Sequence, residues 1–360
     1  MISPSHRAWR LASLAVVLSI TWLSTACAGP TVDKTYSIAT VFPTTGPAAA
    51  VGLAMQRAVD LAAKQNAILG GGYTLTVSHI DEATVVGNSA ATTFASDHHV
   101  VGIIGPFDSQ TAVSMLPIVQ QNGITTISPT ATLPGLTLSD QATAENLPFT
   151  QLHPQGTPNA FFRLPQTDTV AGKIAADLAV APASGHGLAA QNVFIVDDGS
   201  PASLALAAAF KQELTAKHAT PLGQQSITAG SPDSVQSAIV ATIRANADIV
   251  FYAGDIEAGA ELRHALAQYG VPQLVLLTAG HIAADPGWSA AVQLVPASAY
   301  TTALLPAQDL SKLTTAKDFV TAYQSAFAGK DLLPESALAY DAAMDEIAAI
   351  KAIVASGKPV

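Results

Sequence analysis

The stretch from Val100 to Thr137 reads VVGIIGPFDSQTAVSMLPIVQQNGITTISPTATLPGLT and decides the fold class. Its first residues form an apolar run that ends at Gly105-Pro106, a pattern typical of a buried parallel strand followed by a turn. Asp108 and Ser109 then stand where a helix N-cap belongs, ahead of apolar residues at helical spacing. A second apolar run, Ile124–Ile127, leads into a loop of Ser, Thr and Pro. The pattern therefore predicts strand, turn, helix and strand.

This order of elements predicts a binding site. The carboxyl ends of parallel strands meet at one edge of a sheet, where α/β proteins bind ligands. The residues that fall at this edge are Ser109, Thr130, Ala131 and Thr132. Hydroxyl groups, backbone N–H groups and a helix N-terminus favour an anionic group such as a carboxylate. The alternative interpretation is that Ser109 is an ordinary N-cap and that the two threonines belong to an ordinary polar loop.

Strands and helices alternate along most of the chain, which predicts parallel sheets with right-handed crossovers. The chain has 360 residues, of which 49% are hydrophobic, enough for about two domains. Residues 133–160 break this rhythm with a segment rich in Pro, Thr and Gln. Loops of that length are often functional, and the alternative is a surface insertion.

The N-terminus has the pattern of an export signal. Arg7 and Arg10 precede an uncharged, mostly apolar stretch that ends in Leu23-Ser24-Thr25-Ala26-Cys27. This ending is similar to a bacterial lipobox, which predicts a lipoprotein signal peptide over residues 1–27, a lipidated Cys27 and a tether over 28–34. The alternative is a plain secretory signal with an incidental cysteine. Because Cys27 is the only cysteine, an internal disulfide is excluded.

Composition argues against other classes of protein. The chain carries 16 basic and 26 acidic residues, a net charge of −10, and it has no basic run, so we expect no nucleic-acid partner. The nine histidines show no metal-ligand spacing, and nucleophile elbows, phosphate loops and HExxH motifs are missing from the sequence. We therefore expect no metal, no cofactor and no enzymatic activity.

Several segments together resemble the branched-chain amino-acid (leucine/isoleucine/valine) substrate-binding proteins of ABC transporters, of the type I periplasmic binding protein family. The matching segments are IGPFDSQTA (104–112), GITTISPTATLPGLT (123–137), NVFIVDDGS (192–200) and SALAYDAAMDEIAAI (336–350). The resemblance implies an α/β fold of two Rossmann-like lobes with central parallel sheets, joined by a hinge. It places residues 35–162 and 303–352 in lobe 1, and 163–302 and 353–360 in lobe 2. Because family members run further, it also implies that C-terminal strands of the second lobe are missing.

The resemblance also implies roles for the site residues. Ser109 and Thr132 would bind the carboxylate of an amino acid, Thr130 and Thr132 would receive its ammonium, and Ala131 would complete this loop. Asp255, after the strand FYAG, would supply a carboxylate to the ammonium, although it could equally be the N-cap of the next helix. The chain departs from the family at Val51, Ala202 and Ala279, where larger or charged side chains are common. These departures leave the ligand open.

The function implied is capture of a small molecule, an amino acid or related compound, and its delivery to an ABC permease. The protein would be a monomer, exported and lipid-anchored on the outer face of the cytoplasmic membrane or in the periplasm. Two alternatives remain, a ligand-sensing receptor module and a degenerate homologue with a structural role in the envelope.

Overall fold

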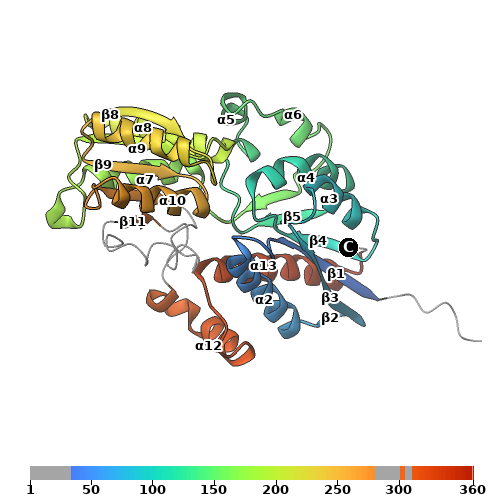
Figure 1. Cartoon of the computed structure of the whole chain (residues 1–360). Helices are drawn as coiled ribbons and strands as arrows, with labels where there is room; N and C mark the ends of the chain where they lie inside the picture. The colour runs from blue at the N-terminus through green and yellow to red at the C-terminus, as the bar shows by residue number, and fades with distance from the viewer. Residues whose placement is uncertain (1–33, 280–300, 305–309, 359) are drawn as a thin grey trace, which may run out of the picture. The chain divides into compact units, whose positions relative to one another are not determined.

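The computed structural model describes residues 34–279, 301–304, 310–358 and 360 (Figure 1). The predicted signal peptide and Cys27 lie outside the described residues. In the part of the chain that is described, no helix is both long and apolar enough to cross a membrane.

The first sheet is mixed and has six strands in the order β2-β3-β1-β4-β5-β6. Strand β2 pairs with β3 in antiparallel fashion, whereas β1, β4, β5 and β6 pair in parallel. The strands are β1 (Thr35–Phe42), β2 (Ile68–Gly70), β3 (Tyr73–Asp81), β4 (Val100–Ile104), β5 (Thr125–Ser128) and β6 (Phe161–Arg163).

The second sheet has five strands in the order β11-β10-β9-β7-β8, and all its pairs are parallel. The strands are β7 (Asn192–Asp197), β8 (Thr220–Ser226), β9 (Ile249–Ala253), β10 (Val275–Ala279) and β11 (Thr301–Leu304). All five residues of β9 are buried. A strand covered on both faces is expected to be apolar throughout, as IVFYA is.

Helices cover both sheets. The described α-helices are α2 (Ala49–Gln65), α3 (Gly87–Ala95), α4 (Ser109–Asn122), α5 (Ser139–Ala144), α6 (Phe149–Leu152), α7 (Asp168–Val180), α8 (Pro201–Ala216), α9 (Pro232–Arg244), α10 (Ile256–Gln268), α12 (Lys317–Ala326) and α13 (Pro334–Ser356). Short 3₁₀ turns lie at η1 (Pro134–Leu136), η2 (Ala183–Gly185), η5 (Leu310–Lys312) and η6 (Thr314–Ala316).

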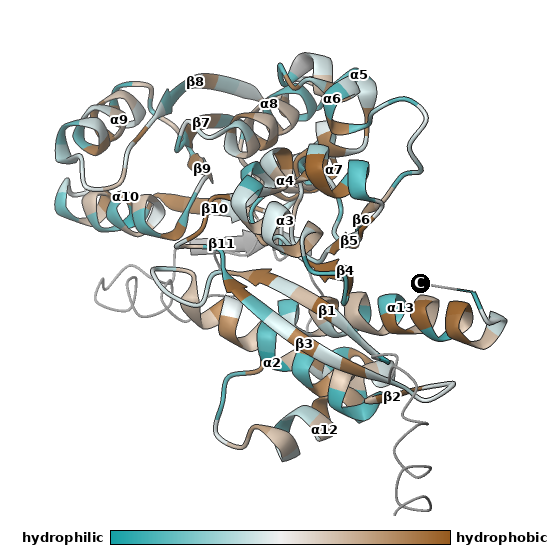
Figure 2. Ribbon diagram, turned by 90° about the vertical axis from the view of Figure 1, so that its right-hand side faces the viewer, coloured by the Kyte–Doolittle hydropathy of each residue, from teal (hydrophilic) through white to brown (hydrophobic). Residues whose placement is uncertain are grey.

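The cores lie between these layers. On the first sheet, α2 and α13 pack side by side and share one apolar cluster, while α3 and α4 cover the other face. Figure 2 shows how strongly apolar residues mark β4 and α13. On the second sheet, α9 and α10 cover one face, and α7 and α8 cover the other. Covering both faces leaves the strand ends as the exposed part of each sheet.

The structure differs from the sequence prediction at several elements. The hairpin β2–β3 makes the first sheet mixed rather than parallel, because three successive glycines at positive φ, Gly70 to Gly72, allow a turn after a strand of three residues. Strand β8 was not predicted, because TPLGQQS is polar and lies at the edge of its sheet. Residues 133–160 hold η1, α5 and α6.

The end of the chain also differs from the expected division. Helix α13 continues to Ser356, and both Val354 and Val360 pack against the cluster of the first sheet. The resemblance places residues 353–360 in the second lobe, whereas Val354 and Val360 pack against the cluster of the first sheet. Strand β11 belongs to the second sheet as far as Leu304, two residues past the expected boundary.

Candidate functional site

A cavity of about 350 Å³ lies at the carboxyl ends of strands from both sheets. Its size is in the range that small-molecule sites occupy. The residues that line this cleft follow β1, β4, β5 and β6 of the first sheet and β7, β9 and β10 of the second. They are Pro47, Ala48, Phe107, Asp108, Thr130, Thr132, Gln166, Asp168, Ala171, Asp198, Ser200, Ala202, Ser203, Leu206, Gly254, Asp255, Ile256, Glu257 and Ala279.

The half-buried carboxyl group of Glu82 holds the turn after β4. Glu82 accepts hydrogen bonds from the backbone N–H groups of Phe107 at 2.7 Å and Asp108 at 2.8 Å. Burial raises the pKa of Glu82 to about 8 despite these bonds. Gly105 precedes the turn with φ of +128°, and a Cβ there would lie 2.6 Å from the carbonyl oxygen of Val41. The turn therefore needs glycine at that position, and it presents Phe107 and Asp108 to the cleft.

Asp108, rather than Ser109, caps helix α4. Its side chain accepts from the N–H groups of Gln110 at 2.7 Å and Thr111 at 3.2 Å. Ser109 is buried at 4% exposure, and its hydroxyl accepts from the N–H groups of Thr132 at 3.1 Å and Leu133 at 3.2 Å. Ser109 thus fixes the loop after β5 and is not among the residues that line the cleft.

The loop after β5 is held by its own hydroxyl groups. Thr130 donates its hydroxyl proton to the carbonyl oxygen of Phe107 at 2.8 Å. The N–H of Ala131 donates to the Ser128 hydroxyl at 2.8 Å, and Ala131 is fully buried. Thr130 and Thr132 line the cleft, whereas Ala131 does not.

Asp255 lies on the opposite wall of the cleft. Its side chain accepts from the N–H of Ala258 at 2.8 Å, so it is the N-cap of α10 as the alternative interpretation held. It is also exposed and lines the cleft. The structure therefore brings Thr130, Thr132 and Asp255 to one cavity, and leaves Ser109 and Ala131 behind its wall.

Sequence reasoning did not assign four acidic residues of the cleft to the site, namely Asp108, Asp168, Asp198 and Glu257. Asp198 accepts from the N–H groups of Ser200 and Asp255, each at 2.9 Å, and from the Ser203 hydroxyl at 2.5 Å. Its position just after the strand in NVFIVDDGS was a usable signal, since the ends of parallel strands form such sites.

Asp168, the first residue of α7, is 5% exposed, and its Oδ2 has no hydrogen-bond partner. Burial raises its pKa to about 7, although the Thr132 hydroxyl and the Arg163 guanidinium act in the opposite direction. Arg163 itself donates to the carbonyl oxygens of Leu133 at 2.6 Å and Pro134 at 2.9 Å and to the Thr137 hydroxyl.

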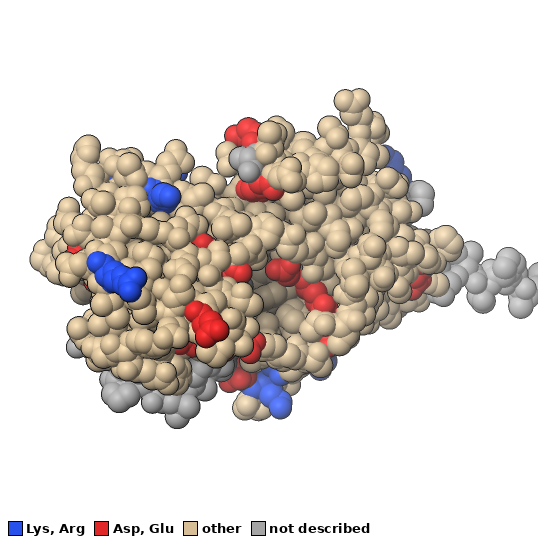
Figure 3. Space-filling model, turned by 45° about the horizontal axis from the view of Figure 1, so that its top comes forward, with Lys and Arg blue, Asp and Glu red and all other residues tan. Residues whose placement is uncertain are grey.

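The small residues noted in the sequence fall in different places. Val51, in the first turn of α2, is fully buried in the core and does not line the cleft. Ala202 and Ala279 do line it, and they leave space where a larger side chain would stand. Figure 3 shows acidic side chains around a hollow on one face of the molecule.

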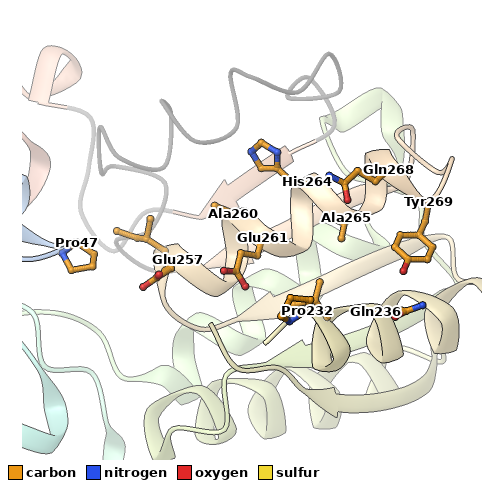
Figure 4. Close-up of a pocket in the computed structure, with 12 residues that line it drawn as sticks. Pro47, Pro232, Gln236, Glu257, Ala260, Glu261, His264, Ala265, Gln268 and Tyr269 are labelled. Carbon is orange, nitrogen blue, oxygen red and sulfur yellow. The ribbon is translucent and has the colours of Figure 1, made fainter. Parts of the chain in front are cut away.

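A larger cavity, of about 720 Å³, lies between α9 and α10 (Figure 4). Figure 4 shows Glu257, Glu261 and His264 projecting from α10, with Pro232 and Gln236 on the neighbouring helix. This cavity is lined by the surfaces of two helices and by Pro47, and none of its lining residues has a buried side-chain polar atom without a partner. The smaller cleft, which gathers strand ends from both sheets, is therefore the candidate site.

The comparisons with known proteins all indicate the same family. A family model described as periplasmic binding protein matches residues 35–359. The Leu/Ile/Val-binding protein BraC3 of Rhizobium johnstonii is 27% identical over 242 residues. The match covers 66% of this chain and 59% of BraC3, so the chain spans less than two thirds of the length of BraC3. Leu/Ile/Val-binding protein homolog 3 of Brucella melitensis is 25% identical over 97% of this chain and 89% of its own.

Among solved structures, the leucine-binding protein LivK of Thermotoga maritima superimposes with a TM-score of 0.70 at 21% identity. The match covers 90% of this chain and 84% of that chain. At this identity the likeness concerns the fold, and it confirms the predicted α/β architecture.

Proposed function

The chain belongs to the periplasmic binding protein family, and on that premise we propose that it captures a small solute in the cleft and delivers it to an ABC importer. The observation that carries this proposal is the cleft itself, because residues at the strand ends of both sheets line it. A solute held there would contact groups from both sheets at once, as capture between two lobes requires.

The solute is an amino acid or a related compound. Its polar group would lie against Thr130 and Thr132 on one wall and Asp255 on the other. The apolar part would face Phe107, Leu206 and the space beside Ala202 and Ala279. Hydrogen bonds to a charged ligand contribute about 1.5–3 kcal/mol each, so a few of them suffice for affinity in the micromolar range, about −8 kcal/mol.

Capture proceeds by movement of one lobe against the other. One lobe would hold residues 35–162 with the C-terminal helices α12 and α13, and the other would hold residues 163–304, which include β11. Closing the lobes would exclude water from the cleft, which strengthens the polar contacts. The closed form would then dock on the permease. The protein would act as a binding protein and catalyse no reaction.

Export and lipid anchoring at Cys27 would keep the protein at the outer face of the cytoplasmic membrane, where a monomer can reach the permease. Mass spectrometry of the N-terminal peptide from cells that express the natural gene tests this assignment. A diacylglyceryl group on Cys27, lost in Cys27→Ser, is expected. An unmodified N-terminus at another residue would contradict it.

A thermal-shift screen of the purified protein tests solute capture. The panel contains leucine, isoleucine, valine, amides, small aromatic acids and small amines. Because a ligand at 100 times its Kd stabilises the folded state by about 2.7 kcal/mol, a saturable rise in Tm is expected with at least one compound. A folded protein that responds to none of them would contradict the proposal and favour a degenerate homologue.

A further inference from the structure

The described residues that line the cleft carry one sign of charge. Five of them are carboxylates, and no Lys, Arg or His is among them. The five are Asp108, Asp168, Asp198, Asp255 and Glu257. Walls of one sign concentrate ligands of the opposite sign. On charge alone, the cleft attracts cations.

Helix N-termini do not reverse this preference. Helices α2, α4, α7, α8 and α10 all begin at the cleft, and each N-terminus carries about half a positive charge. Of these, α4, α7, α8 and α10 begin at or beside one of the carboxylates, and Asp108 and Asp255 accept from the free N–H groups of α4 and α10. About two and a half positive charges in total then face up to five negative ones, so the wall stays net negative.

The groups expected to bind a ligand carboxylate are already engaged. The N–H of Thr132 donates to Ser109, the hydroxyl of Thr130 donates to Phe107, and the N–H of Ala131 donates to Ser128. An anionic ligand that used these three donors would first have to break their bonds.

Asp168 differs from the other four carboxylates because its unpartnered oxygen is buried. Its side chain lines the cleft at 5% exposure, and Oδ2 is buried without any hydrogen-bond partner. Leaving a buried acceptor unsatisfied is unfavourable, so a donor that reaches it gains more than the usual hydrogen bond. The nearby cation Arg163 directs its N–H groups to Leu133, Pro134 and Thr137.

We propose that the solute of this cleft is an organic cation whose ammonium or amidinium group binds Asp168, and that a carboxylate on the solute is dispensable. This inference rests on the proposed function and names the chemical class of its ligand. Asp168 is the specificity-determining residue. The remaining carboxylates concentrate the cation at the cleft.

Cation binding at Asp168 must release a proton. In the free protein the pKa of Asp168 is about 7, with Thr132, Arg163 and Glu145 as the polar or charged groups that act on it. The carboxyl is therefore mostly protonated at about pH 6, and a bound cation favours its ionised form. Uptake of one amine would release close to one proton at about pH 6 and almost none at about pH 8.5. Affinity would rise with pH up to about 7 and then level off.

Calorimetric titration with three matched probes tests the proposal. The probes are L-leucine, isoamylamine (leucine without its carboxylate) and 4-methylpentanoate (leucine without its ammonium), and benzylamine and benzoate form a second pair. Each is titrated at two pH values, in buffers of different ionisation enthalpy, so that the protons released can be counted. The two amines are expected to bind, and the two acids to bind at least about tenfold more weakly.

Two variants separate Asp168 from the general charge of the cleft. Asp168→Asn keeps the shape of the side chain but cannot ionise, so amine affinity is expected to fall about tenfold or more and proton release to vanish. Glu257→Gln removes the same charge from an exposed side chain of the same cleft and is expected to change the affinity less than about threefold.

The outcomes are distinguishable. Leucine or an acid that binds while the amines do not would overturn this inference and leave solute capture intact. Amines that bind equally well to Asp168→Asn, or with unchanged proton release, would also overturn it. Absence of binding by every probe would count against the inference and against the proposed function together.

Discussion

The Ser109 hydroxyl accepts a hydrogen bond from the backbone N–H of Thr132 at 3.1 Å, and this bond joins the start of α4 to the loop after β5. The two residues lie 23 positions apart in the chain. Both are expected from the sequence to face a ligand, and only Thr132 lines the cleft. Ser109 therefore shapes the cleft from behind by holding Thr132 in place.

Ser109→Ala should destabilise the protein and weaken binding indirectly. The change leaves the N–H groups of Thr132 and Leu133 buried without an acceptor, which costs about 1–3 kcal/mol. Urea unfolding measures the loss. Ser325→Ala, which removes an exposed hydroxyl bonded within α12, is the matched control and should change the stability by less than about 0.5 kcal/mol. Equal effects of the two changes would contradict the role assigned to Ser109.

The buried carboxyl of Glu346 should make stability depend on pH. Glu346 lies on α13 at 3% exposure, its Oε2 has no partner, and burial raises its pKa from 4.5 to about 8. Between these two values the folded protein binds more protons than the unfolded chain, so this contribution to stability falls as the pH rises. Glu346→Gln should therefore be close to neutral at about pH 4.5 and stabilise by roughly 1–3 kcal/mol at about pH 8. Denaturant unfolding at both pH values measures the difference, and a gain that is the same at both would contradict this account.

Gly102 and Glu346 should be energetically coupled. A Cβ on Gly102 would lie 2.2 Å from Glu346 Oε1, so Gly102→Ala requires the buried side chain to move. Overpacking of this kind costs typically about 1–3 kcal/mol. In a Glu346→Ala background the alanine should fit at little cost, because the clashing group is gone. A double-mutant cycle from unfolding curves measures the coupling, and strictly additive effects would rule out the contact.

Asp198→Asn should loosen the wall formed by the second sheet. The carboxylate of Asp198 accepts from Ser200, Ser203 and Asp255, and an amide can satisfy fewer of these donors. We expect a loss of about 1–3 kcal/mol in stability, with a matching loss of the ligand-induced rise in Tm. Asp233→Asn, an exposed residue in the first turn of α9, removes the same charge and should cost about 0.3–1 kcal/mol at most. A stable Asp198→Asn with full ligand response would contradict the assignment.

Much of the fold could be predicted from local pattern. The stretch that begins at Val100 contains β4, α4 and β5 in the predicted order, because apolar runs, a helix cap and strand-end turns are all local features. The short strand β2 and the polar edge strand β8 could not be predicted, since their pairing depends on neighbours distant in the chain.

The site was less predictable than the fold. Residue type and motif predicted that Thr130, Thr132 and Asp255 lie at the carboxyl ends of strands, and all three line the cleft. The direction of the Ser109 hydroxyl is fixed by a tertiary contact, which no local pattern reveals. No local pattern in the sequence marks Asp168, because its unpartnered oxygen results only from packing beside Thr132 and Arg163.

Capture of a solute in the cleft is tested most directly by filling the cleft. Ala202 lines it at the start of α8, and Ala208 is an exposed alanine on the same helix. Titration calorimetry with isoamylamine and with L-leucine compares the unaltered protein with Ala202→Trp and Ala208→Trp. A ligand bound by the unaltered protein should be lost in Ala202→Trp and retained in Ala208→Trp. Equal binding by all three proteins would place the ligand elsewhere and contradict capture in the cleft.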